Sequence, residues 1–66
     1  MLTKEAECVL EDLIDKNNLS SVIEALVAIC EEKAIHVEAN WQDQDLAKAW
    51  RRAAKAIDAA SVKIEV

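Results

Sequence analysis

The chain contains neither glycine nor proline, and this absence constrains its fold more than any other feature of its 66 residues. Glycine readily takes left-handed backbone conformations and proline stops helices, so tight hairpins and strand ends are hard to build without them. The apolar residues recur at helical spacing over most of the length. The sequence therefore predicts an all-α fold whose short turns use Asn, Asp or Ser.

These patterns predict a three-helix bundle with short Asn/Asp turns and an extended C-terminal tail. The helical domain spans residues 1–60, with helices at about 3–16, 19–39 and 44–60. Residues 61–66 alternate between apolar and charged side chains, which is a strand pattern. One short strand does not persist alone, so we expect the tail to fray, to pack along a groove, or to pair with the same tail of another subunit.

Polar residues mark the expected helix starts. Thr3 and Asp43 each precede a helical stretch and are expected to cap it through a side-chain oxygen. Asn18 tolerates left-handed backbone, so it can end the first helix and cap the second. Ser21 and Glu24 have the spacing of a capping box, which places the start of the second helix between Asn18 and Ser21.

The second helix is apolar on more than one side. Val27 and Ile35 lie off its main face, and such a helix either packs between two neighbours or forms an oligomer interface. Lys33 falls on the main face, where its aliphatic stem would lie along apolar surface while its ammonium group reaches water. The main face consists of Leu19, Val22, Ile23, Leu26, Ile29, Cys30, Ala34 and Val37.

The third helix separates its apolar side chains from its basic ones. The basic stripe could bind phosphate or an acidic protein surface, or simply be solvated, because a short stripe without aromatic residues is weak evidence for nucleic-acid binding. This basic stripe consists of Lys48, Arg51, Arg52 and Lys55. The apolar face, which we expect in the core, consists of Leu46, Ala49, Trp50, Ala53, Ile57 and Ala60.

Size and charge restrict the partners. A chain of 66 residues lies near the lower limit at which one core holds a fold, so we expect a homo-oligomer, most simply a dimer, or a complex with a larger protein. The net charge of −5 makes nucleic acid a poor partner. No apolar run approaches the ~20 residues of a membrane span. The acidic start lacks the features of a secretory signal and the two cysteines are expected to be free thiols, so we expect a cytoplasmic protein.

The sequence offers little for catalysis or metal binding. His36 is the only histidine, with Glu32 and Asn40 four residues to either side, and these donors would hold a metal only if a second copy supplied more. The cysteines do not form a CxxC pair, and a phosphate-binding loop needs glycine. We therefore predict that the protein is not an enzyme and uses no cofactor or metal. An active or metal site built from Lys33, His36 and Cys30 is the weakest hypothesis.

Two tryptophans flank the second turn. Trp41 and Trp50 each suit a core position, where the indole N–H needs a partner. Alternatively, one ring anchors a protein-binding surface, as tryptophan does at interface hot spots. The candidate interaction surface for this alternative consists of Val27, Ile35, His36, Asn40, Trp41 and Gln42.

Several short segments between residues 19 and 57 form a pattern. They are Ala25-Leu26, Ile29-Cys30, Glu32-Lys33-Ala34, His36, Asn40-Trp41-Gln42-Asp43, Ala47-Lys48-Ala49-Trp50 and Arg52-Ala53. In this pattern the chain resembles small uncharacterised bacterial and phage-associated helical proteins. The resemblance implies a compact helical fold and transfers no activity, ligand or catalytic residue.

Two functions of different classes fit these features. The first is a non-catalytic helical interaction module that presents apolar surfaces and self-associates. The alternative is an acidic regulator, such as an antitoxin-like inhibitor or a mimic of nucleic-acid charge, which acts through the carboxylates of the first helix and of the outer face of the second. A charge mimic would lose affinity steeply with rising salt, whereas an apolar docking module would not.

Overall fold

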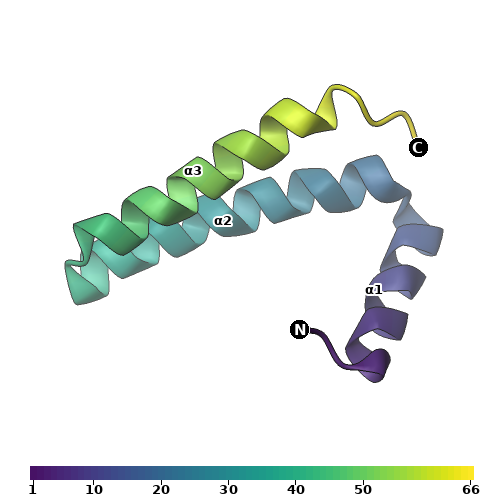
Figure 1. The fold of residues 1–66 in the computed structure, drawn as a ribbon, viewed down its shortest axis with the longest axis horizontal. Helices are drawn as coiled ribbons and strands as arrows, with labels where there is room; N and C mark the ends of the chain where they lie inside the picture. The colour runs from purple at the N-terminus through teal and green to yellow at the C-terminus, as the bar shows by residue number, and fades with distance from the viewer.

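The computed structural model describes all 66 residues and contains three α-helices and no strand. Helix α1 spans Lys4–Asn17, α2 spans Leu19–Trp41 and α3 spans Gln44–Ser61 (Figure 1). The all-α architecture of three helices is therefore confirmed, and each predicted end lies within two residues of the observed one. None of the helices combines the length and the apolar character that crossing a membrane requires.

Helices α2 and α3 form an antiparallel hairpin (Figure 1). Its turn consists of Gln42 in the left-handed conformation, at φ 52° and ψ 31°, followed by Asp43. The Leu46 backbone N–H donates a hydrogen bond of 3.0 Å to Oδ1 of Asp43, so the predicted cap is confirmed. The expected break at Asn40-Trp41-Gln42-Asp43 is shorter than predicted, because α2 continues to Trp41.

The junction between α1 and α2 is a single residue, Asn18, at φ 75° and ψ 159°. Its backbone N–H donates to the Ile14 carbonyl at 2.7 Å, and its side chain accepts from the Ser21 N–H at 2.8 Å. Asn18 rather than Ser21 thus caps α2, so the capping-box assignment is wrong, although the helix starts within the predicted interval. Thr3 caps α1 as predicted, because its Oγ1 accepts from the Ala6 N–H.

Helix α1 stands apart from the hairpin. It contacts α2 but not α3, and it turns away on the side of α2 that is remote from α3 (Figure 1). Helical hairpins use connections of about two to five residues, so a one-residue junction cannot lay α1 back along α2. Consequently, α1 contains no buried residue.

The core is small and lies only between α2 and α3. Five residues are buried, and no large side chain is fully enclosed. The residues that α3 buries in the core differ from the predicted apolar face, since Leu46 of that face is 45% exposed. The reason is that α2 alone packs on α3, and the small alanines one step around the helix allow the closest backbone approach. The buried residues are Cys30, Ala34, Val37, Ala47 and Ala54.

The tail after α3 folds back over the start of α2. The Ser20 backbone N–H donates a hydrogen bond of 2.7 Å to the Val66 main-chain oxygen, and the Ser20 hydroxyl donates to the same oxygen at 2.9 Å. The first amides of a helix lack partners within it, so the tail satisfies one of these donors. Of the three expected arrangements, the structure shows packing.

Candidate interaction surfaces

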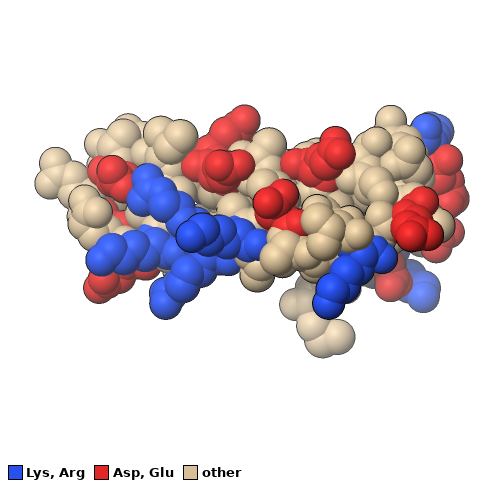
Figure 2. All heavy atoms as spheres, turned by 90° about the horizontal axis from the view of Figure 1, so that it is seen from above, with Lys and Arg blue, Asp and Glu red and all other residues tan.

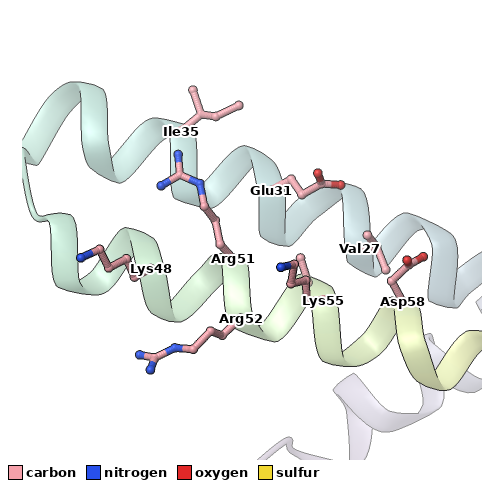
Figure 3. Close-up of a pocket in the computed structure, with 9 residues that line it drawn as sticks. Val27, Glu31, Ile35, Lys48, Arg51, Arg52, Lys55 and Asp58 are labelled. Atoms are coloured by element: carbon pink, nitrogen blue, oxygen red, sulfur yellow. The ribbon is translucent and has the colours of Figure 1, made fainter.

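The α2–α3 hairpin presents two long faces of opposite character. Figure 2 shows the largest group of Lys and Arg side chains toward one end of the molecule, bordered by Asp and Glu, with other Lys and Arg side chains apart from it. On one of the two faces lies a groove of about 720 Å³ between the two helices, which we call the basic groove (Figure 3). It is lined by Val27, Glu31, Ile35, Lys48, Arg51, Arg52, Ala54, Lys55 and Asp58.

The basic groove has apolar side chains between charged ones. Ala54 is buried and Val27 is half-buried, whereas Ile35 remains 62% exposed. The Arg51 guanidinium donates through Nη1 to Oε2 of Glu38 at 2.8 Å. The other three cations, Lys48, Arg52 and Lys55, form no ion pair within the chain.

The opposite flank of the hairpin is apolar and uncovered. With about 100° of rotation per residue, Leu26 and Ile29 project from the side of α2 opposite to Glu31 and Ile35. The same rotation places Leu46 opposite to the basic stripe on α3, and in an antiparallel pair these two flanks face the same side. We call this surface the open apolar face; it consists of Leu26, Ile29, Leu46, Ala49 and Ala53.

The large side chains of the open apolar face are partly exposed to solvent. Leu26, Ile29 and Leu46 are 37%, 48% and 45% exposed. In a closed three-helix bundle a third helix lies over such a face, but the one-residue junction directs α1 elsewhere. Helix α1 itself leaves Val9 and Leu13 exposed at 62% and 45%. The chain thus displays apolar surface on both the hairpin and α1.

The structure divides the predicted interaction surface into two parts. Val27 and Ile35 join the whole basic stripe in the groove. By contrast, His36 and Asn40 pair with each other, because Asn40 Nδ2 lies 3.1 Å from His36 Nδ1 and donates to the His36 carbonyl at 3.0 Å. The sequence alone assigns Val27 and Ile35 to a different surface from the basic stripe. Two signals in the sequence could have placed them in one groove with the basic stripe. Val27, Glu31 and Ile35 are spaced four residues apart on one side of α2, and the two-residue turn brings α3 alongside α2.

The two tryptophans have different environments. Trp41 is 73% exposed, so its expected place in the core is wrong, because it ends α2 at the turn, where α3 does not cover its ring. Trp50 is half-buried on α3. Trp41 and the neighbouring Gln42 therefore form an exposed end of the hairpin, separate from the basic groove.

No arrangement suited to metal chemistry is present. No group of three or more His, Cys, Asp or Glu side chains lies close enough to hold a metal ion. Cys30 is buried, whereas Lys33 and His36 are exposed in a shallow depression beside Ile29, so these three do not form a common site. Both Cys8 and Cys30 are free thiols.

Comparisons with known proteins give no further direction. No protein-family model, no curated protein and no solved structure matches this chain. The two faces of the hairpin are therefore the features that bear on function.

Proposed function

We propose that the protein is a non-catalytic helical interaction module that works as a homodimer through its open apolar face. The observation that supports this proposal is the large solvent-accessible surface area of the chain. A compact monomer of 7.3 kDa has an accessible area of roughly 4,200 Å², whereas this chain exposes 5410 Å². If two copies each covered the excess of about 1,200 Å², the interface would have the size of an obligate homodimer.

The small core supports the same conclusion. Five buried residues, all of small or medium size, provide little apolar burial for a chain of 66 residues. The radius of gyration is 13.5 Å, against about 11 Å for a compact chain of this length. A second copy over Leu26, Ile29 and Leu46 would supply a second layer and add apolar burial to this small core.

The dimer has a simple geometry in this proposal. Two-fold symmetry places the open apolar face of one copy against the same face of the other, which gives four antiparallel hairpin helices around a common core. Lys33 is exposed and projects in the direction between Leu26 and Ile29, so in this dimer its stem packs within the interface and its ammonium group extends to water.

Light scattering after size-exclusion chromatography tests the proposal with two matched variants. Ile29→Glu places a carboxylate in the proposed interface, so the mass should fall from that of a dimer to that of a monomer, with loss of helical circular dichroism. Ile35→Glu changes a similarly exposed isoleucine of the same helix on the other face, and it should remain dimeric. Equal behaviour of the two variants, or a monomeric unmodified protein, would contradict the proposal.

The acidic regulator is the second candidate function, and α1, which contacts α2 alone, favours it. All acidic side chains of this helix are exposed, and only Glu7 and Asp12 have an ion-pair partner in the chain. Titration with a basic protein such as a histone at rising salt separates the two functions, because binding by carboxylates weakens steeply with salt whereas dimerisation through apolar surface does not.

A further inference from the structure

The basic groove lies on the face of the hairpin opposite to the proposed dimer interface, so it stays accessible in the dimer. Its lining carries four cations and two carboxylates, although the whole chain has a net charge of −5. Lys48, Arg52 and Lys55 have no ion-pair partner in the chain. A concentrated positive patch on an acidic protein selects for an acidic partner.

The apolar part of the groove restricts the chemistry of that partner. Val27 and Ile35 lie along α2 on either side of Glu31, across the groove from the cations of α3, and Ile35 remains largely exposed (Figure 3). Nucleic acid gains little from aliphatic side chains, and the groove has no aromatic ring on which a base could stack. A partner that presents both carboxylates and apolar side chains would contact both the cations and the apolar residues of the groove.

The dimensions suit a helix. Val27 and Ile35 are two turns apart on α2, or roughly 12 Å, so the groove accepts about two to three turns of a partner helix. The cations lie toward the α2–α3 turn, and Asp58 lies at the far end (Figure 3). The Glu38–Arg51 pair, at 2.8 Å, shows how a carboxylate from a neighbouring helix is held beside this groove.

We infer that the basic groove binds an acidic amphipathic helix of another protein, with its carboxylates over Lys48, Arg52 and Lys55 and its apolar side chains on Val27 and Ile35. The site is separate from the open apolar face. A groove variant that remains dimeric therefore tests this inference separately from the proposed dimer.

Fluorescence anisotropy with the full chain tests this inference. The probe is a labelled synthetic helix of Glu, Leu and Ala with all Leu on one face, and the comparison probes are the same peptide with Gln for every Glu, and a single-stranded DNA oligonucleotide. The acidic peptide should bind, more weakly as salt rises, and the Gln peptide and the DNA should bind at least about tenfold more weakly.

Two double variants with the same change in charge locate the site. R52E/K55E should weaken binding of the acidic peptide about tenfold or more, whereas K4E/K16E, which changes two exposed lysines of α1, should leave it unchanged. Circular dichroism should show equal helicity in both. Ile35→Glu, which adds a carboxylate to the groove and leaves the open apolar face unchanged, should weaken binding of the acidic peptide while the chain stays dimeric.

Four outcomes would overturn the inference. They are no binding of the acidic peptide, equal or tighter binding of the DNA, an equal loss in both double variants, and tight binding only of a labelled peptide with the sequence of residues 4–17. The last outcome would identify α1 of a second copy as the occupant in place of another protein.

Discussion

The junction between α1 and α2 is one residue long, whereas that between α2 and α3 is two residues long. At the longer junction, Gln42 takes a left-handed conformation and Asp43 caps the next helix, so the chain reverses and the helices pack. At the shorter one, Asn18 must end one helix and cap the other, and α1 diverges. A difference of one residue in the length of the junction therefore decides whether two consecutive helices pack along each other. Because α1 does not pack along α2, an apolar face of the hairpin remains uncovered.

Lengthening the shorter junction should have the largest effect. Insertion of Gly-Ser-Gly after Asn18 would allow α1 to fold back over Leu26 and Ile29 of its own chain, so we expect a compact monomer in place of a dimer. Light scattering measures the mass, and small-angle X-ray scattering measures the compaction. The same insertion after Gln42 serves as the control and should leave the dimer. If both insertion variants remained dimers, the length of the α1–α2 junction would not be what leaves the apolar face uncovered.

Overpacking the contact between α2 and α3 should have the next largest effect. Ala34 is fully buried, so Ala34→Leu should lower the free energy of unfolding by about 1–3 kcal/mol. Ala28→Leu adds the same atoms at an exposed position of α2 and should lower it little. Urea denaturation measures both, and equal stability of the two variants would show that α2 and α3 are not closely packed.

Removal of the two caps compares the junctions directly. Asp43→Ala should cost about 1 kcal/mol through the lost hydrogen bond to Leu46. Asn18→Ala should cost more, about 2 kcal/mol, because alanine also disfavours φ 75°. Asn18→Gly, which suits that φ, should recover most of the loss. A smaller cost at Asn18 than at Asp43 in urea denaturation would contradict this ranking.

The ion pair between α2 and α3 should have the smallest effect. Both side chains are more than one-third exposed, so Glu38→Gln should cost less than about 1 kcal/mol, and the cost should shrink with added salt. Glu31→Gln on the same helix, which breaks no ion pair, is the control. Thermal unfolding at two salt concentrations measures the difference, and a cost independent of salt would contradict an ionic origin.

The helix bounds and the Thr3 and Asp43 caps could be predicted from the sequence, whereas the Ser21 capping box was wrong and the long-range packing could not be predicted. The Thr3 and Asp43 caps depend on residues three positions apart, and both are present. The buried face of α3 was misplaced because helical periodicity alone does not reveal how many neighbours a helix has. With α2 as its only neighbour, α3 buries Ala47 and Ala54 and leaves Leu46 exposed.

The candidate sites also differ in how far the sequence predicts them. The basic stripe on α3 could be recognised from spacing, since its members lie on one side of one helix. Its meeting with Val27 and Ile35 depends on the hairpin geometry, which brings residues about twenty positions apart to one groove. The open apolar face depends on the direction of α1, which a single backbone conformation at Asn18 determines.

Sedimentation equilibrium of the unmodified protein over a range of concentrations tests the central claim most directly. The account predicts a mass twice the 7.3 kDa of the chain, with dissociation on dilution accompanied by loss of helical circular dichroism. A particle of 7.3 kDa that keeps its full helical content at every concentration would contradict the account, because the open apolar face would then need no partner.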